Sequence, residues 1–286
     1  VVAFAAWTGL ASVVFALVFT QGLLVVAWQR RSVRPLVVLA VTVGVLAVAA
    51  WAAAPGAASG TLRVAVAGWR GSRPPVAEMF AAAAANGAAL LVIPETAIVV
   101  PDLDTARTEW GAIARQHGVA AVLGAWVHAT DDNRALFLDR HGELLGSYAK
   151  THLVPVFEDY RTGDGRAVVR DLGTAVGAMI CQDDNFTDVA REVATHGARL
   201  IAIPSNDWPA IAPFHLANCI FRAIETGCAL ARATSNGISA LVAPGGRVVA
   251  TADHLADGYQ LLTADVPLGR GVPTLHARVG DWPLLI

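Results

Sequence analysis

The sequence predicts a layered α/β domain preceded by two transmembrane helices. The first sixty residues or so are apolar and almost uncharged, whereas apolar runs with strand character alternate with helical segments after Leu62. The whole chain of 286 residues is 55% hydrophobic and only 15% charged. This composition is too apolar for an ordinary soluble enzyme, and the excess lies at the N-terminal end.

Two uncharged stretches, residues 1–28 and 35–62, predict the membrane helices, the second with a core of Val, Leu and Ala over residues 36–54. About 20 apolar helical residues cross a hydrocarbon core of about 30 Å. A buried hairpin in a soluble protein would rarely have uncharged runs this long. A signal peptide is disfavoured because residues 1–28 lack a basic start and a second apolar run follows.

The charges between the two stretches predict their orientation. Residues 29–34 read Q-R-R-S-V-R, whereas residues 55–62 are small and uncharged. Because arginines favour the cytoplasmic side, we expect everything after about Thr61 to be extracytoplasmic. Val1 would then lie on the extracytoplasmic side and within an apolar run, so we expect further membrane spans upstream. Residues 279–286 become apolar around Trp282, as in an approach to another membrane helix.

The globular domain is predicted to cover residues 62–278, after a flexible Pro/Gly/Ala/Ser linker at residues 55–61. Strand-like and helix-like patterns follow one another along it. The expected strands are residues 62–67, 89–93, 119–127, 135–139, 144–149, 173–180, 199–203, 229–233, 239–242, 248–250 and 259–264. The expected helices are residues 76–85, 104–117, 186–196 and 213–227.

Charge and cysteine content exclude some classes of function. A net charge of -2 and the absence of a basic stripe give no sign of a nucleic-acid partner. The three cysteines form no disulfide framework. We expect Cys219 and Cys228 to share one helix, too far apart for a bridge, and to serve as packing residues.

Three residues that follow strand-like runs carry the chemistry. Glu95 stands in L-V-I-P-E-T, Lys150 in Y-A-K-T-H-L-V-P and Cys181 in G-A-M-I-C-Q-D-D. A thiol is a useful nucleophile only as the thiolate, which a carboxylate base and a nearby ammonium can generate. The same ammonium can hold an oxyanion. If the sheet brings these side chains to one pocket, the sequence predicts cysteine acyl transfer.

Short sequence motifs around these residues match the pattern of a known protein family. P-E-T at 94–96, K-T-H-L-V-P at 150–155, I-C at 180–181, S-N-D at 205–207, S-N-G at 235–237 and G-D-W at 280–282 occur together and in order. This chain, from about Leu62 to its end, resembles the carbon-nitrogen hydrolase (nitrilase) superfamily, and within it the membrane-bound apolipoprotein N-acyltransferases. The two apolar stretches are similar to that family's membrane part.

The resemblance implies a four-layer αββα nitrilase-type sandwich with Glu95 as general base, Lys150 as oxyanion stabiliser and Cys181 as nucleophile. It also implies Glu158 as a supporting carboxylate. We expect the backbone N–H of Gln182 to assist Lys150. The implied partners are a phospholipid acyl donor, a lipoprotein or other amine acceptor, and the lipid bilayer. The implied location is the bacterial inner membrane, multi-pass, with the domain on its extracytoplasmic side.

The segments that would contact the substrate depart from the acyltransferase pattern. Gln182 and Asp183 follow the cysteine where Tyr and Glu are typical, and Trp208 directly follows S-N-D. Residues 156–166 are polar for a lipid-binding lid. Substrate contacts are therefore assigned provisionally, to His152, Asp183, Asn206, Asp207 and Trp208. His152 also suits packing or hydrogen bonding beside Lys150, and Asn206 and Asp207 suit a structural role equally well.

We expect no metal and no cofactor. Asp102 with Asp104, and Asp183 with Asp184, have no His or Cys at ligand spacing, and His215 with Cys219 makes only two ligands.

Three functions stay open at this point. The first is a membrane-bound cysteine acyltransferase that works through a thioester. The second is a membrane-anchored amidohydrolase with the same triad and water as acceptor. The third is a catalytically silent membrane scaffold that keeps only the fold.

Overall fold

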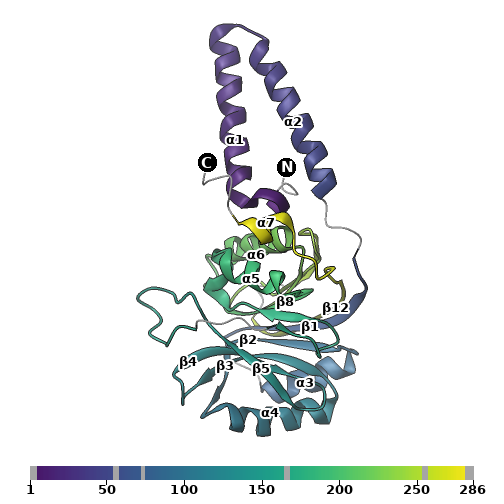
Figure 1. Ribbon diagram of the computed structural model, residues 1–286. Helices are drawn as coiled ribbons and strands as arrows, with labels where there is room; N and C mark the ends of the chain where they lie inside the picture. Colours follow the sequence, from purple (N-terminus) through teal and green to yellow (C-terminus); the bar gives the residue numbers. More distant parts are fainter. Residues whose placement is uncertain (1–4, 54–57, 72–74, 164–167, 253–256, 281–286) are drawn as a thin grey trace.

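The computed structural model describes residues 5–53, 58–71, 75–163, 168–252 and 257–280. Two helices begin the chain, α1 (Ala5–Arg30) and α2 (Arg34–Ala53). A mixed α/β domain follows (Figure 1). Its strands are β1 (Thr61–Arg70), β2 (Leu90–Val100), β3 (Ala120–Val127), β4 (Asp132–Leu138), β5 (Leu144–Ala149), β6 (Val168–Val169), β7 (Val176–Ala178), β8 (Leu200–Asn206), β9 (Ala229–Ser235), β10 (Ala240–Val242), β11 (Val248–Thr251) and β12 (Gly258–Pro267). Its helices are α3 (Val76–Ala85), α4 (Leu103–His117), η2 (Cys181–Asn185), α5 (Asp188–Thr195), α6 (Ala212–Thr226) and α7 (Leu275–Val279).

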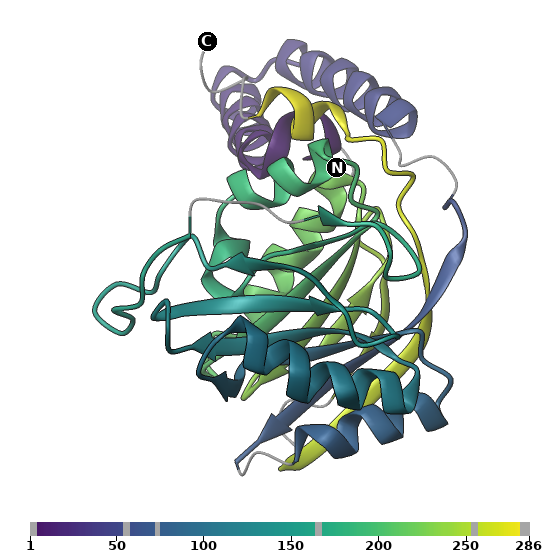
Figure 2. The same cartoon turned by 60° about the horizontal axis from the view of Figure 1, so that its bottom comes forward.

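The strands form two halves that join along β1 and β9. One half runs β5-β4-β3-β2-β1, with β12 antiparallel to β1; the other runs β9-β8-β7-β6, with β10 paired to β9 and β11 paired to β10. Only Gly68 and Trp69 of β1 pair with β9, so the two halves turn to face each other. Helices α3 and α4 cover the outside of one half, and α5 and α6 cover the other (Figures 1 and 2). The arrangement is a four-layer αββα sandwich.

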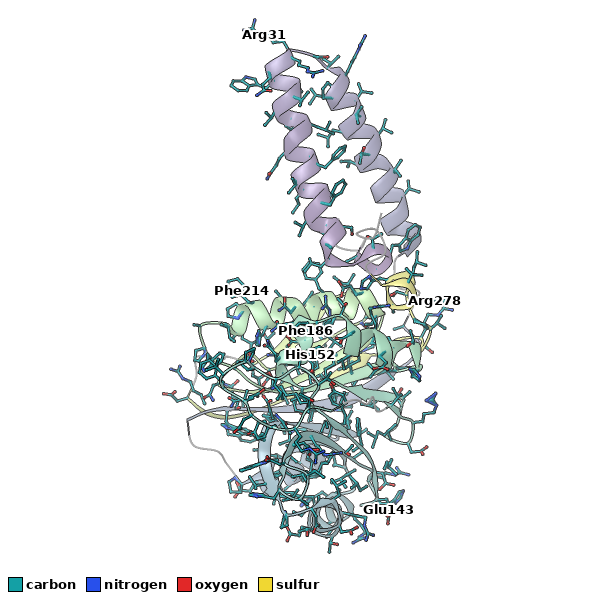
Figure 3. All side chains as sticks on the ribbon, turned by 60° about the vertical axis from the view of Figure 1, so that its left-hand side comes forward. Arg31, Glu143, His152, Phe186, Phe214 and Arg278 are labelled. Carbon is teal, nitrogen blue, oxygen red and sulfur yellow. The ribbon has the colours of Figure 1, made fainter. Side chains whose placement is uncertain are left out.

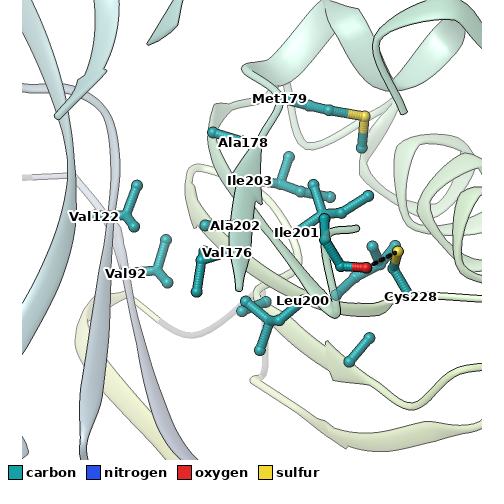
Figure 4. Packing of buried hydrophobic residues seen from close by; sticks show 14 of the residues in the cluster. Val92, Val122, Val176, Ala178, Met179, Leu200, Ile201, Ala202, Ile203 and Cys228 are labelled. Carbon is teal, nitrogen blue, oxygen red and sulfur yellow. Dashed lines mark hydrogen bonds between the residues drawn. The ribbon is translucent and has the colours of Figure 1, made fainter. Parts of the chain in front are cut away.

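Alternation along the strands builds the two sides of the first sheet. In β2, Leu90 and Val92 face the second sheet, whereas Leu91 and Ile93 face α3 and α4. The same period of two holds in β1, β3 and β4. Figure 4 shows Val92 and Val122 opposite Val176 and Ala202 across the interface between the sheets. Burial on both faces explains why these strands read as nearly continuous apolar runs.

Helices α1 and α2 form a hairpin that projects away from the domain. Figure 3 places Arg31 at the end of the hairpin farthest from the sandwich. Large apolar side chains point outward along it, including Phe15 at 66%, Val18 at 62% and Val41 at 61% exposure. A surface this apolar is unsuited to water and suited to lipid. Within the described residues, one helix, α1, is long and apolar enough to cross a membrane; the expectation of two such helices is met only in part.

The base of α1 docks on the domain. Gly9, at φ 75 and ψ 177, bends the helix, so that Ala5 and Ala6 pack against Ile224 of α6. Beyond the bend, the backbone N–H of Leu10 donates to Glu225 Oε1 at 2.8 Å. Glu225 therefore satisfies a backbone donor that the bend leaves without a helical partner.

Several predicted elements differ in extent. Strand β2 continues through P-E-T to Val100 instead of stopping at residue 93, and β7 is much shorter than residues 173–180. Cys228 does not share a helix with Cys219, because α6 ends at Thr226 and Gly227 turns the chain with φ 70. Part of the predicted linker, residues 55–57, and most of the predicted approach to a further helix, residues 281–286, lie outside the described residues.

Candidate functional site

A bulge in β2 presents Glu95. The pairing of β2 with β3 shifts register between Ile93 and Ile98, and Thr96 has a φ of 47. The bulge sits directly on Gly124 of β3, where a Cβ would lie 2.6 Å from the Glu95 Cα. A bulge re-aims a side chain out of the strand's regular alternation. Glu95 is buried, at 5% exposure, and its Oε1 accepts from Asn133 Nδ2 at 2.7 Å.

Lys150 lies directly after β5 and is completely buried. Its Nζ donates to Glu95 Oε1 at 2.7 Å and to Glu158 Oε1 at 2.6 Å. Glu158 is itself held in place, because its Oε2 accepts from the backbone N–H of Val154 at 2.8 Å. The structure thus brings together three residues separated in sequence, and one ammonium is shared by two carboxylates.

Cys181 follows β7 as the first residue of η2. It is 4% exposed, and its Sγ donates to the Asn206 carbonyl at 3.5 Å. Its φ of 44 is uncommon for a residue with a side chain. Four residues in or beside the pocket have such a positive φ: Thr96, Val156, Cys181 and Asn236. Backbone conformations of this kind concentrate at functional sites.

The electrostatics of the three residues are coupled. Burial raises the pKa of Glu95, against the opposing effect of Lys150. Burial also raises the pKa of the Cys181 thiol; Glu95 adds to this and Lys150 opposes it. Burial lowers the pKa of Lys150, but Glu95, Cys181 and Glu158 outweigh burial and leave it raised. The lysine is therefore cationic, and the sulfur is a thiol until a base takes its proton.

A pocket of about 390 Å³ opens above these groups. Glu95, Glu158 and Cys181 line it, while Lys150 lies behind the two carboxylates. The other lining residues come from the loops at the strand ends: Thr96, Asn133, Val154, Phe157, Tyr160, Gln182, Asn206, Asp207, Trp208, Pro209, Ile211, His215 and Asn236.

A second charged cluster borders Cys181. Asp207 accepts from Arg232 Nη2 with both oxygens at 2.8 Å, from Ser205 Oγ at 3.0 Å, and contacts His215 Nδ1 at 3.0 Å. Arg232, fully buried on β9, also donates to Asp184 at 2.5 Å. Burial raises the pKa of Asp207, but Arg232 and His215 outweigh it and lower the pKa to about 2.

Cys181, Asp207 and His215 offer three potential metal-ligand atoms within 4.8 Å of one another. This grouping is not apparent from sequence spacing. Oδ1 of Asp207 already accepts from Arg232 and Ser205 and contacts His215, and Oδ2 accepts from Arg232, so the protein holds both oxygens of this carboxylate.

The provisional substrate contacts divide into two groups. Gln182, Asn206, Asp207 and Trp208 line the pocket. His152 and Asp183 are not among its lining residues, and a role for either in substrate contact stays a prediction. His152 pairs with Asp188 at 2.9 Å and stacks on Phe186, near which Figure 3 shows it. Asp183 is fully buried and accepts from Tyr148 and from the backbone of His152 and Ile180.

Sequence reasoning missed three residues that the site uses. Asn133 holds Glu95, Arg232 holds Asp207, and His215 lines the pocket. Asn133 lies in β4 just before an apolar run and is only 1% exposed. A buried polar group of this kind needs a hydrogen-bond partner. His215 stands one helical turn before Cys219, and this spacing does not reveal that His215 lines the pocket.

The fold and site together define a class of α/β sandwich protein with a buried cysteine beside a Lys–Glu pair. The chain belongs to the carbon-nitrogen hydrolase family, which matches residues 71–274.

Among curated proteins, the chain is similar to the apolipoprotein N-acyltransferase of Gloeobacter violaceus, with 32% identity over 70% of this chain and 43% of the relative. It is also similar to that of Methylococcus capsulatus, with 29% identity over 68% of this chain and 44% of the relative. The chain thus spans less than half the length of these relatives.

Among solved structures, the chain resembles two forms of the amidase from Nesterenkonia sp. AN1. One carries the acetamide moiety of fluoroacetamide on its active-site cysteine; it has a TM-score of 0.62 and 26% identity, and the match covers 74% of this chain and 92% of that one. The other is a complex with butyramide, with a TM-score of 0.62 and 26% identity over 74% of this chain and 94% of that one.

Proposed function

We propose that this protein is a membrane-bound cysteine acyltransferase. It moves an acyl group from a phospholipid to the amine of a lipoprotein, or to another lipid-linked amine, through a thioester on Cys181. The observation that carries the proposal is the contact of one buried ammonium, Lys150, with both Glu95 and Glu158 at the floor of a pocket that Cys181 lines.

In the first half-reaction, Glu95 takes the Cys181 proton and the sulfur attacks the ester carbonyl of the donor. The raised pKa of Glu95 suits a base that must hold this proton and return it to the leaving alcohol. Lys150, with the backbone N–H of Gln182, stabilises the oxyanion. The C–O bond then breaks, which leaves a thioester and a lysophospholipid.

The surroundings of the pocket support a lipid substrate. Val156 is 99% and Phe157 73% exposed, and the Phe157 ring meets Trp208 edge-on with centroids 5.3 Å apart. Both rings line the pocket. Phe157 and Trp208 therefore give the pocket an apolar rim beside an otherwise polar segment, and such a rim suits an acyl chain.

The hairpin supports a membrane location. Its apolar surface is exposed, and Arg31 lies at the end remote from the domain. With the arginine loop in the cytoplasm, the domain lies outside. This orientation predicts that a cysteine placed at exposed Ser59 reacts with an impermeant maleimide from the extracytoplasmic side. Cys219 and Cys228 are buried and do not line the pocket, and the test uses a Cys181→Ala background, so the signal comes from the new thiol. Labelling from the cytoplasm alone contradicts the orientation.

A second candidate is a membrane-anchored amidohydrolase, favoured by the fold match to an amidase with a cysteine at its active site. Water would then replace the amine, and the polar lining residues Asn133, Asn206 and Asn236 would suit a small amide. A catalytically silent scaffold would keep the fold without turnover.

One experiment separates these candidates. Detergent-solubilised protein is mixed with a phospholipid of defined chains and examined by intact-protein mass spectrometry. We expect one acyl mass, mapped to Cys181 and absent from Cys181→Ala, with Cys219→Ala as the matched control that still acylates. Turnover of simple amides without any lipid adduct indicates the amidohydrolase, and neither activity indicates the scaffold.

A further inference from the structure

The proposed transfer to an amine requires more than one base, because the amine loses two protons. An α-amino group has a pKa of about 8, so the acceptor arrives mostly as an ammonium at neutral pH. The ammonium must lose two protons to become an amide N–H. As the C–N bond forms and the C–S bond breaks, Glu95 can pass one proton to the departing sulfur. The other proton must leave first, because an ammonium has no lone pair with which to attack.

We propose that His215, oriented by Asp207, is the base that takes this first proton. The inference rests on the proposed function, since water as acceptor needs no such step. His215 would act on the acceptor alone, and Glu95 would act on the thiol in both half-reactions.

The hydrogen bonds of Asp207 fix how the ring must be protonated. Its carboxylate is held by Arg232 and Ser205, and its pKa of about 2 keeps it ionised. An ionised carboxylate only accepts, so Nδ1 of His215, 3.0 Å away, donates the proton to it. The neutral ring then carries its lone pair on Nε2. Among the residues that the structure describes, none is recorded as a hydrogen-bond partner of that nitrogen.

The ring is placed where an acceptor would arrive. His215 lines the same pocket as Glu95 and Cys181, and one of its ring nitrogens lies within 4.8 Å of Cys181 Sγ. It comes from α6, outside the second sheet, whereas Glu95 comes from β2 of the first. The two candidate bases thus reach the cysteine from different layers of the sandwich.

Charged groups from several elements surround the imidazole ring of His215. Asp207 faces it from the end of β8 and Asp184 from η2, while Arg232 of β9 approaches Nδ1 at 3.5 Å. Glu95 and Glu158 also line the pocket, and both pair with Lys150. Carboxylates and one guanidinium thus face the ring together, and the pocket that His215 lines gives the transferred proton a route to solvent.

The test examines the second half-reaction alone. Cys181 is loaded with an activated acyl ester, which makes the thioester whether or not a phospholipid is the natural donor. The acyl-enzyme is then chased with a diacylglyceryl-cysteine peptide, and its decay is followed by mass spectrometry. The variant is His215→Asn, whose amide can still donate to Asp207. The control is His196→Asn on the outer face, whose Nδ1 contacts the Glu192 carbonyl.

At neutral pH we expect His215→Asn to load normally but to transfer to the peptide amine about 100-fold more slowly or worse, the usual contribution of a general base. His196→Asn should match the wild type. Hydroxylamine is neutral at this pH, so it should discharge the variant at the wild-type rate. Raising the pH above the pKa of the amine should restore transfer in the variant.

Three results overturn the inference. His215→Asn may be equally slow with hydroxylamine, or gain nothing from high pH; either result assigns His215 a structural role. A wild-type acyl-enzyme that passes its acyl group to water and never to an amine overturns it as well. Failure of the proposed function gives a different result. The enzyme loaded with the activated ester still transfers its acyl group to amines, but Cys181 is not acylated by phospholipid.

Discussion

Lys150 donates from a completely buried ammonium to Glu158 across 2.6 Å, and the other oxygen of Glu158 is fixed by the backbone of Val154. The lysine is thus held by a carboxylate that is itself anchored, so in the proposed mechanism Glu95 can exchange protons without releasing the ammonium. A buried cation of this kind is held in place before any substrate arrives, as electrostatic catalysis requires.

Replacing Lys150 by Met should abolish acylation of Cys181 and destabilise the fold by about 3–5 kcal/mol, because buried Glu95 and partly buried Glu158 lose their cation. Activity is measured by mass spectrometry and stability by thermal unfolding. Arg63→Met is the matched control. It breaks a pair with Asp265 whose side chains are 45% and 61% exposed, and should cost less than about 1 kcal/mol. Equal losses in the two variants contradict the prediction.

The rate of Cys181 acylation should have an acid limb governed by Glu95. Burial raises the pKa of Glu95 above its ordinary 4.5, and only the ionised form can accept the thiol proton. The rate therefore falls as the pH drops through this raised pKa, so the limb lies above pH 4.5. Glu95→Gln should slow acylation by about 10²–10⁴-fold. A limb at or below the ordinary value, measured in a pH series of the wild type, refutes this assignment.

Because of Asp207, the free energy of unfolding should depend on pH in the acidic range. Its pKa is lowered from 3.8 to about 2, so its stabilising contribution is complete above 3.8 and is lost as the pH falls towards 2. A shift of this size corresponds to about 2 kcal/mol. Above pH 4, Asp207→Asn should be less stable than the wild type by at least this amount, and the gap should narrow on acidification. Thermal unfolding across the acidic range checks this, and a constant gap contradicts it.

Gly124→Ala should lower activity by about tenfold or more, because the new Cβ would lie 2.2 Å from the Pro94 carbonyl oxygen and push the bulge that carries Glu95. Gly146→Ala in β5 is the matched control. Its Cβ would meet only a Val169 methyl at an ordinary 3.7 Å. Comparable kcat values for the two variants would falsify the link between Gly124 and the position of Glu95.

The sequence alone predicts much of the fold and the principal cluster. Helix α3 and strand β5 match their expected limits, because uninterrupted apolar patterns end there at Asn86 and Lys150. The meeting of Glu95 and Lys150 was expected from the motifs that carry them. Cys228 was misplaced because Gly227 ends α6 by backbone conformation, which the hydrophobic pattern does not record.

The second cluster could not be predicted in this way. Arg232, Asp207 and His215 come from β9, the end of β8 and α6, and their contacts exist only once the second sheet has formed. The sequence does show an arginine, Arg232, within an apolar strand-like run. Such an arginine needs carboxylate partners once it is buried, but the sequence does not say which carboxylates they are. Asn133 likewise becomes meaningful only when β4 is paired beside the bulge in β2.

The bond from Leu10 to Glu225 ties the proposed membrane helix to the same α6 that bears His215. Under the proposed function, this bond would hold the pocket at one height above the bilayer. The acceptor would then have to reach the pocket with its amine, so the distance between the amine and its own lipid anchor would decide which acceptors are used.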